Sequence, residues 1–499
     1  MVAFGGSACA QTWRIEPSLT LESTFTNNVN LLPADERKAD WVNALTPSVR
    51  FTEIGAHSRV TGNISVPVFL YMRTPHENNY VAPTANINGT FDAADRRFFV
   101  DTSVNVQQQY LSPFAAHPSD LTNATQNRYT SQAYRISPYV KGLAGEGIDY
   151  ELRQSSLWTD ANATGITNGR AYTNEVSGHI AREPRPFGWS AEFDRSDTDF
   201  TESVNSETFQ IARLRGLHQV DPSLQISAIA GYEDNRFFLT HESGVTYGAG
   251  ARWHLSERTS VDADWEHRFF GSSYHVAGSH RTPLTVWSIS ASRDITTFPQ
   301  QLAGFPAGVN IPDFLNTLFL SRFPDPTQRQ SAVDQVIRER GLPTTLTSAL
   351  PVFAEQVTLL ESATATLGLL GARNSVFFTA FRLRNQPVEP VAVADLTPLL
   401  AQLLNQTQVG ANATWTHQLE PRVALTAALE WSRSTSNGST SNAQSDAVTR
   451  QYAVRAGVST SLTALTTVYT GIRYQDFRTD VFSSFREFAV FVGLTHAFH

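Results

Sequence analysis

Apolar and polar residues alternate strictly along most of this chain. In the last segment, SFREFAVFVGLTHAFH, the bulky side chains Phe488, Val490, Val492 and Leu494 alternate with small or polar residues. Such alternation places the two sets of side chains on opposite faces of a β-strand. The same pattern recurs in VALTAALEWSR, SVDADWEHRF and GVTYGAGARWHL, where the second face carries charged residues as well as hydroxyls. The chain is therefore predicted to consist of many strands, each with one apolar face.

Two architectures accommodate strands of this kind. In a soluble sandwich the apolar faces meet each other, but open sheets with very many strands curl or split. In an outer-membrane barrel the apolar face meets lipid and the polar face lines an aqueous lumen. Trp158, Trp431, Tyr474 and Tyr110 fall at the ends of apolar stripes, where interfacial aromatic girdles lie. No stretch approaches the roughly 20 apolar residues of a transmembrane helix, so a membrane-spanning barrel is favoured.

The connections between the predicted strands alternate in length. Short links such as EIGAHS, DAADRR, GLAGEG and QLEPR alternate with long polar stretches such as SPFAAHPSDLTNATQN, as in barrels with short periplasmic turns and longer outer loops. The alternation holds only if residues 274–296 are divided at RTPLT, where Pro283 disfavours a continuous strand. The sequence thus predicts an all-β fold: a single closed antiparallel transmembrane β-barrel of about 22 strands (roughly 20 to 24).

Two inserts, residues 297–356 and 388–406, interrupt the strand pattern within a barrel predicted over residues 11–499. The first contains DPTQRQSAVDQVIRERG, in which Asp325 is a suitable helix N-cap and Gly341 ends the segment. The second contains DLTPLLAQLLNQ, in which Thr397 starts another short helix.

Apolar stripes on these inserts suggest a gate. IPDFLNTLFL carries Phe314 and Leu318 at helical spacing, and Leu399 and Leu403 form a matching face on the second insert. An exposed stripe of this size favours association. We expect the inserts to pack together as a helical cap or an inward-folded plug over one mouth of the barrel. In the alternative, each helix lies flat on the membrane interface beside the rim.

The polar strand faces predict the lining of the pore. The predicted pore-lining residues are Asp149, Glu151, Glu192, Asp194, Glu233, Asp262, Asp264, Glu266, Arg268, Arg382, Arg384, Glu430, Arg455 and Arg473. The set is mainly acidic in the middle of the chain and basic later. One hypothesis is that opposite arcs of the wall carry opposite charge and create a transverse field. The alternative is a network of mutually neutralising charges that solvates the lumen.

Composition narrows the partners and the chemistry. A formal net charge of −8 argues against nucleic acid as a partner. Cys9 is the only cysteine, and Ala8-Cys9-Ala10 before Gln11 is typical of a secretory cleavage site. Residues 1–10 are accordingly predicted to be the remnant of a signal peptide, which would leave no cysteine for disulfide or thiolate chemistry.

Catalytic and metal-binding signals are weak. The sequence contains no HExxH, CxxC or CxxCH motif. His241, Asp234 and Ser243 lie close in sequence, but a chance grouping of this kind is expected in a chain of this length. We predict no catalytic, metal-binding or cofactor-binding residues, no cofactor and no enzyme activity; a site at the outer rim is the remaining enzymatic alternative.

Several segments carry a family resemblance. TFTNNVNLLPADERKADWVNALTPSVRF, WEHRFFGSSYHVAGSHRT, RERGLPTTLTS and LLGARNSVFFTAFR resemble a family of barrels associated with PEP-CTERM/exosortase systems. The resemblance implies a bacterial outer-membrane barrel encoded near exopolysaccharide biosynthesis genes, with outer-membrane lipid, the barrel-assembly machinery, polysaccharide and periplasmic export components as partners. The last strand resembles the C-terminal signal read by that machinery. Phe498 is assigned to this recognition, although His499 follows it, whereas such signals usually end on the aromatic residue.

A function is inferred from the predicted barrel and from the family resemblance. No globular plug is apparent before the first predicted strand, so the channel is expected to be open, closed by its own inserts or occupied by another protein. The leading interpretation is a transport conduit or assembly component for exopolysaccharide export and biofilm matrix production. The alternative is a barrel that sheathes a partner such as a periplasmic cytochrome.

Overall fold

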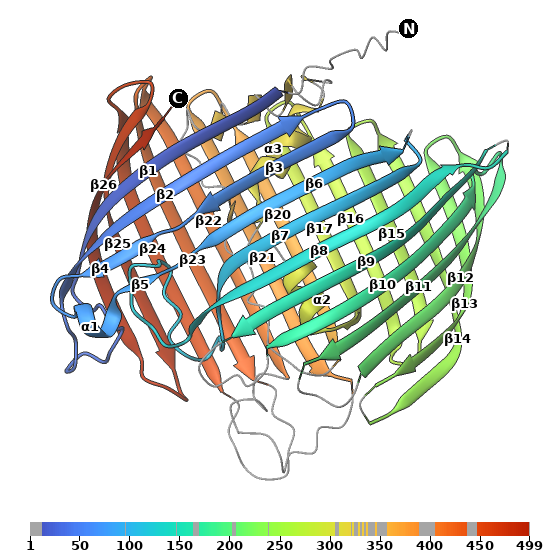
Figure 1. The fold of residues 1–499 in the computed structure, drawn as a ribbon, viewed down its shortest axis with the longest axis horizontal. Helices are drawn as coiled ribbons and strands as arrows, with labels where there is room; N and C mark the ends of the chain where they lie inside the picture. The colour runs from blue at the N-terminus through green and yellow to red at the C-terminus, as the bar shows by residue number, and fades with distance from the viewer. Residues whose placement is uncertain are drawn as a thin grey trace, which may run out of the picture.

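In the computed structural model, the strands of the protein form a single continuous barrel wall (Figure 1). The structure describes residues 12–94, 96–145, 147–162, 169–201, 206–237, 239–304, 309–320, 322–323, 328–329, 332–333, 336–337, 345–346, 357–388, 405–436 and 447–498. The predicted signal-peptide remnant, residues 1–10, lies outside these residues. Every neighbouring pair of strands is antiparallel, and β26 pairs with β1 to close the sheet.

The wall consists of 22 crossings. Those of the first half are β1 (Thr12–Thr26), β2 (Asp40–Ile54), β3 (Ser58–Ser65) continued by β4 (Val68–Tyr71), β6 (Thr84–Ala94) preceded by β5 (Tyr80–Val81), β7 (Phe98–Tyr110), β8 (Arg128–Leu143), β9 (Ile148–Asn162), β10 (Arg170–Arg182), β11 (Phe187–Phe200), β12 (Ser206–Asp221) and β13 (Leu224–Arg236). Those of the second half are β14 (His241–Ser256), β15 (Thr259–Arg268), β16 (Gly271–Arg281), β17 (Thr285–Thr296), β20 (Thr358–Leu370), β21 (Asn374–Pro387), β22 (Gln406–Glu420), β23 (Val423–Ser436), β24 (Val448–Ser461), β25 (Thr466–Thr479) and β26 (Phe485–Ala497). The remaining elements are α1 (Pro75–Asn78), α2 (Phe298–Gly304), α3 (Ile311–Phe319) and a two-stranded ladder of β18 (Val309–Asn310) and β19 (Thr345–Leu346).

The two ends of the barrel differ in their connections. One end carries the short links, among them 55–57, 183–186, 222–223, 371–373 and 421–422, together with the start of β1 and the end of β26 (top in Figure 1). In the GLAGEG link, Gly145 and Gly147 adopt positive φ of 68° and 75°, which favours glycine. We refer to this end as the turn end and assign it to the periplasm, and to the other as the loop end.

The predicted division between β16 and β17 is confirmed. The strands end at Arg281 and resume at Thr285, with Pro283 in the turn between them. The alternation of short and long links is less strict than predicted, because residues 237–240 and 269–270 form short connections at the loop end.

The outer surface has the apolar band that a bilayer requires. Trp287 and Ile289 of β17 and Val490 of β26 are large exposed apolar residues, and they alternate with inward-facing polar or small ones. Trp158, Trp431 and Tyr474 belong to this exposed set. An apolar exterior around a closed wall without free edges identifies an outer-membrane barrel, as predicted. Tyr110 does not join the girdle, because its hydroxyl donates a hydrogen bond to the Pro118 carbonyl of an inward-folded loop.

Among the described residues, no helix is long and apolar enough to cross a membrane.

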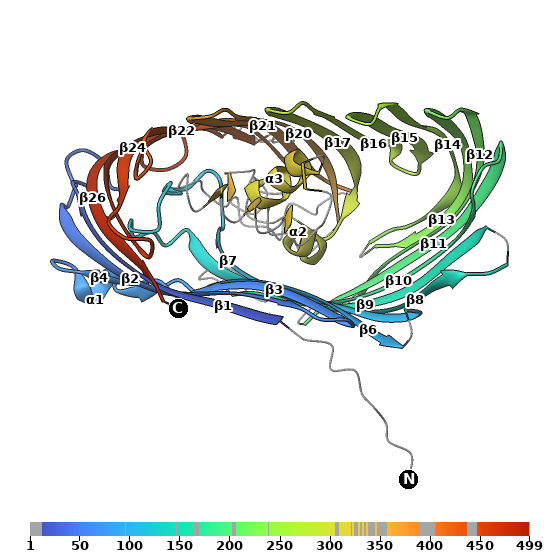
Figure 2. The same ribbon diagram turned by 90° about the horizontal axis from the view of Figure 1, so that it is seen from above.

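The helices of the first insert that the structure describes, α2 and α3, lie inside the barrel. Figure 2 shows α2 and α3 inside the ring of strands. The insert leaves β17 at the loop end and α3 packs at the turn end, where Leu318 and Phe319 border a cavity lined by Pro283 and Leu370. Helices α2 and α3 thus lie inside the ring, as in the expected inward-folded plug, and not on the membrane interface beside the rim. Its apolar stripe packs against the barrel wall, at Val286 and Phe377. The proposed partner face, Leu399 and Leu403, lies outside the described residues, as do Asp325, Gly341 and Thr397.

Candidate functional site: the channel lumen

The loop between β7 and β8, residues 111–127, packs against one side of the lumen wall. Its Asp120 Oδ2 lies 2.8 Å from Arg455 Nη1 and 2.9 Å from Arg473 Nη1 on the wall. Arg473 also donates a hydrogen bond of 2.8 Å to Glu487 Oε1. Burial raises the pKa of the Asp120 carboxyl, but Arg473 and Arg455 outweigh that effect and hold the pKa well below its ordinary range. The loop is thus held against β24 and β25 by the ion pairs of Asp120 with Arg455 and with the buried Arg473.

Helix α2 spans the lumen near the loop end. Phe298 and Leu302 pack with Tyr129 of β8 and Ala161 of β9. Gln300 of the same helix donates a hydrogen bond of 3.1 Å from its Nε2 to Oε1 of Glu175, which lies on the next strand, β10.

The start of α2 remains attached to the opposite wall. Gln301 Nε2 donates a hydrogen bond of 3.2 Å to Thr358 Oγ1 of β20. Because β8–β10 and the neighbouring strands β17 and β20 face each other across the flattened ring (Figure 2), α2 divides the lumen into two halves at this level.

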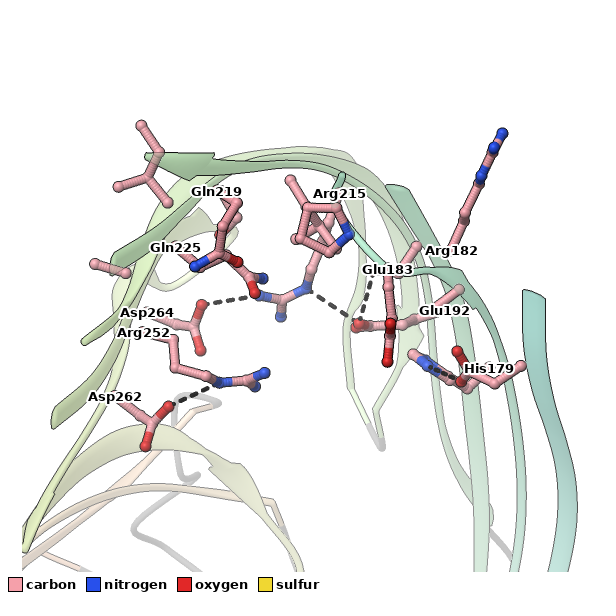
Figure 3. Close-up of a pocket in the computed structure, with 18 of the residues that line it drawn as sticks. His179, Arg182, Glu183, Glu192, Arg215, Gln219, Gln225, Arg252, Asp262 and Asp264 are labelled. Carbon is pink, nitrogen blue, oxygen red and sulfur yellow. Dashed lines mark hydrogen bonds and ion pairs between the residues drawn. The ribbon is translucent and has the colours of Figure 1, made fainter. Parts of the chain in front are cut away.

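The other side of the lumen opens into a vestibule at the turn end. Its volume is about 1010 Å³, and it is lined by side chains of β9–β16 and the turns between them. Arg215 lies between two carboxylates, with Nε 3.1 Å from Glu192 Oε1 and Nη1 2.8 Å from Asp264 Oδ1 (Figure 3). Arg252 Nε donates to Asp262 Oδ1 at 2.9 Å in the same view.

The lumenal face of β15 continues this arrangement toward the loop end. Asp262, Asp264, Glu266 and Arg268 point inward at successive levels, each about 6.8 Å further along the strand. We call these residues and the oppositely charged partners that they contact the charged ladder. Beyond the two vestibule pairs, Arg213 Nε lies 3.0 Å from Glu266.

The last level of the charged ladder is the most buried. Arg268 donates to Glu233 Oε2 from Nη2 at 2.8 Å and from Nε at 3.0 Å, and its Nη1 lies 2.5 Å from Asp294 Oδ1. The Arg268 and Glu233 side chains are 5% and 1% exposed, whereas those of Asp262 and Asp264 are about two-fifths exposed. The ladder therefore leads from an exposed vestibule to a buried ion pair near the loop end.

Two of the predicted pore-lining residues do not line the pore. Arg382 and Arg384 share the outward face of β21 with Phe378, and the inward positions are Phe377, Thr379 and Leu383. The prediction was wrong because the alternation of FFTAFRLRN is ambiguous: both faces carry phenylalanine.

The remaining predicted pore-lining residues occupy the inward-facing positions of their strands. The evidence is that large apolar residues on the opposite faces of these strands are exposed: Leu152, Trp189, Tyr232, Trp265, Leu429, Val454 and Ile472.

These placements contradict the transverse field. The middle acidic residues face arginines of neighbouring strands, and Arg473 is neutralised by Glu487 and Asp120. The structure supports the alternative, a mutually neutralising network. Sequence reasoning missed Arg213, Arg215 and Arg252, although the alternation in TFQIARLRGL places the first two on one face.

Other sequence-derived candidates are also placed. His241 Nε2 lies 2.5 Å from Asp234 Oδ1, but both occupy the outward face beside Tyr232 and Val245, so they form a surface ion pair. Phe498 is 47% exposed, and its N–H donates to the Pro17 carbonyl at 2.8 Å beside the closing strand pair. Among the described residues, no group of three His, Cys, Asp or Glu side chains could hold a metal ion.

The arrangement suits the passage or binding of polar molecules. Carboxylates, guanidinium groups and hydroxyls line the vestibule, and paired charges can exchange their partners for the hydrogen-bonding groups of a solute. The charged ladder offers both donors and acceptors along the depth of the lumen.

One comparison with solved structures supports the fold. No protein-family model matches the chain, and no curated protein sequence matches it. Among solved structures, the FrpB iron transporter from Neisseria meningitidis (F5-1 variant) is similar, with a TM-score of 0.52, 8% identity and coverage of 97% of this chain and 82% of that chain. The siderophore receptor PirA from Acinetobacter baumannii has a TM-score of 0.46 and 9% identity, with coverage of 97% of this chain and 80% of that chain. The outer membrane protein opdK from Pseudomonas aeruginosa has a TM-score of 0.35 and 7% identity, with coverage of 97% of this chain and 99% of that chain. The FrpB likeness supports a large outer-membrane barrel.

Proposed function

We propose that this protein is a self-gated conduit for polar molecules across the outer membrane. The observation that carries the proposal is the charged ladder, which runs from the vestibule toward the loop end in the half of the lumen beside β11–β16. A transport role agrees with FrpB, an iron transporter that shares the fold.

The insert is the gate of this conduit. Helix α2 divides the lumen near the loop end, and α3 is anchored at the turn end. The insert joins the wall strands β17 and β20, so it can leave the lumen without breaking the barrel. Its withdrawal would connect the vestibule to the outer side along the wall that carries the charged ladder.

The cargo proposed is a polysaccharide in export. The resemblance to exopolysaccharide-locus barrels suggests this cargo, and the lumen chemistry is compatible with it. Sugar hydroxyls both donate and accept hydrogen bonds, as do the paired carboxylates and guanidinium groups of the charged ladder taken together. A periplasmic export component would deliver the chain to the vestibule.

A barrel that sheathes a partner protein is the less favoured function. Residues 111–127 are tied to β24 and β25 by the ion pairs of Asp120, and α2 spans the lumen. A cytochrome would have to displace both segments before it could enter.

Planar-bilayer recording of the refolded chain tests the conduit. Residues 298–350, which include α2 and α3, are replaced by a short Gly/Ser linker, and an outward-facing variant, Arg195→Gln, serves as the control. We expect a marked rise in single-channel conductance for the linker variant alone. Equal conductance of all three proteins would contradict the gate.

The cargo is tested separately in cells. Deletion of the gene should abolish or reduce secreted polysaccharide, and the full-length gene should restore it. Unchanged secretion would refute the polysaccharide assignment while leaving the conduit intact.

A further inference from the structure

A row of arginines crosses the outer surface of the barrel near its loop end. Arg433, Arg450 and Arg478 are direct cross-strand partners on β23, β24 and β25. Arg382 lies on the same row, because it pairs with Val409, which pairs with Arg433. We call these four residues the arginine row. Arg384 on β21 and Arg486 on β26 flank it on the same outward face.

The arginine row lies at the height of the lipid headgroups. Two residues toward the middle of the membrane from Arg433 and Arg450 are Trp431 and Tyr452, which form a cross-strand pair and are large exposed aromatics. Tyr474 continues this belt on β25. Aromatic girdles mark the membrane interface, so the guanidinium groups just beyond them meet the outer-leaflet headgroups.

The row is poorly compensated by the protein itself. Like charges directly opposite on a sheet are destabilising. Among the described residues, Asp476 on β25 and Glu361 on the neighbouring strand β20 are the carboxylates in ion-pair contact with these arginines. Asp476 Oδ2 lies 3.0 Å from Arg478 Nη2 and 3.3 Å from Arg486 Nε, and Glu361 Oε1 lies 3.2 Å from Arg382 Nη1.

The other side of the barrel shows the contrast. At the same end, Arg170 is paired with Asp160 at 3.0 Å, and Arg195 with Asp197 at 2.8 Å. Arg170 and Arg195 thus each have a carboxylate, whereas Arg236 on β13 and Arg293 on β17 are single outward arginines with no carboxylate in ion-pair contact among the described residues. Three arginines that are direct cross-strand neighbours occur on β23–β25. The described residues leave the centre of the row, Arg433 and Arg450, without a carboxylate in ion-pair contact.

We propose that the arginine row binds the phosphate groups of an outer-leaflet lipid, a phosphorylated glycolipid of the lipid A type. Guanidinium groups bind phosphate bidentately through their planar N–H donors. Adjacent strands are about 4.8 Å apart, so one phosphate can contact two arginines of the row. The acyl chains of the same lipid would cover the aromatic and apolar face below. A soluble anion would gain nothing from that face.

Native mass spectrometry of the detergent-solubilised full chain tests the site. The probes are diphosphorylated lipid A, dephosphorylated lipid A and inorganic phosphate. The test variant is Arg433→Gln/Arg450→Gln/Arg478→Gln, and the matched control is Arg170→Gln/Arg195→Gln. Heat-modified gel mobility verifies that each barrel is folded, and Arg450→Gln alone provides the test if the triple variant does not refold.

We expect the triple variant to bind diphosphorylated lipid A about tenfold or more weakly, since several charge-assisted bonds are lost. The single variant should show a smaller loss in the same direction, and the control should bind as the unaltered chain does. Dephosphorylated lipid A should bind weakly to every protein. Equal binding by the row variants and the unaltered chain would overturn the proposal. Displacement of the lipid by excess inorganic phosphate would show a free-anion site and overturn the lipid assignment.

Discussion

Gly368 on the inner face of β20 lies directly beneath the ring of Phe314 in α3: a Cβ added at Gly368 would stand 2.3 Å from Phe314 Cε1. The same ring makes an edge contact with Phe377, at 6.3 Å between centroids. The inner wall is therefore shaped to receive the helix, and the absence of a side chain at this one wall position permits the contact.

Gly368→Val should release α3 from the wall. The valine side chain would occupy the space of the Phe314 ring, while β20 itself tolerates or favours a β-branched residue. We expect a higher or more fluctuating single-channel conductance, with barrel stability little changed. Gly244→Val on β14 is the matched control, because a Cβ there meets no atom within 4 Å. An effect of the same size in both variants would argue against a docking role for Gly368.

The stability of the barrel should depend on the buried ion pair between Arg268 and Glu233. Arg268→Leu leaves Glu233 buried without its partner, and loss of one member of a buried pair costs about 3–5 kcal/mol. The double variant Arg268→Leu/Glu233→Leu should recover most of that loss. Urea titration of the folded fraction, followed by heat-modified gel mobility, measures the difference. A double variant as unstable as the single one would mean that the pair is not the source of the effect.

Strand periodicity was sufficient to predict the barrel, but less so its interior. The alternation in β26 determines which of its residues face outward, and Pro283 determines where β16 ends and β17 begins. Both are local properties of the backbone and can be recognised within one segment. The destination of an insert depends on long-range packing instead: nothing within IPDFLNTLFL indicates that Val286 and Phe377 cover it. Helix α2 was not predicted, since FPQQLAG is too short for a periodic signal.

The lumenal charges show the same limit. Asp262 and Asp264 could be assigned to the lumen because Val261 and Trp265 share the other face. Arg382 could not, because its strand has aromatic residues on both faces. The neutralising partners of the acidic residues lie on neighbouring strands, and the cross-strand register that brings them together is not visible in a single strand.

The ion selectivity of the channel should depend on the charges of the paired residues in the vestibule. Arg215→Gln removes the cation between Glu192 and Asp264, so the wall becomes more negative and cation preference should increase. Asp262→Asn/Asp264→Asn should shift the preference in the opposite direction. Reversal potentials under a salt gradient measure both shifts, with Arg195→Gln on the outer surface as the control. Unchanged reversal potentials in both lumenal variants would mean that ions do not pass along this wall.

The docking of residues 111–127 should weaken in mild acid through His117. The imidazole lies between Tyr110 and Phe477, and its Nδ1 is 2.9 Å from the Ala115 carbonyl, to which it donates as the neutral tautomer. Burial lowers the pKa of His117 below its ordinary value of 6.5. The undocked loop therefore binds a proton that the docked loop does not, and the stabilisation present above pH 6.5 is lost as the pH falls toward the lowered pKa.

The Asp120 carboxyl does not contribute in that range, because its pKa is also lowered and its stabilisation persists until stronger acid. Amide exchange of residues 111–127, corrected for its intrinsic pH dependence, measures the effect between pH 7.5 and 5. Exchange should accelerate by up to about tenfold per pH unit once His117 titrates. His117→Phe keeps the aromatic contacts and has no proton to bind, so its loop should show no such acceleration. The same pH dependence in that variant would assign the effect to another group.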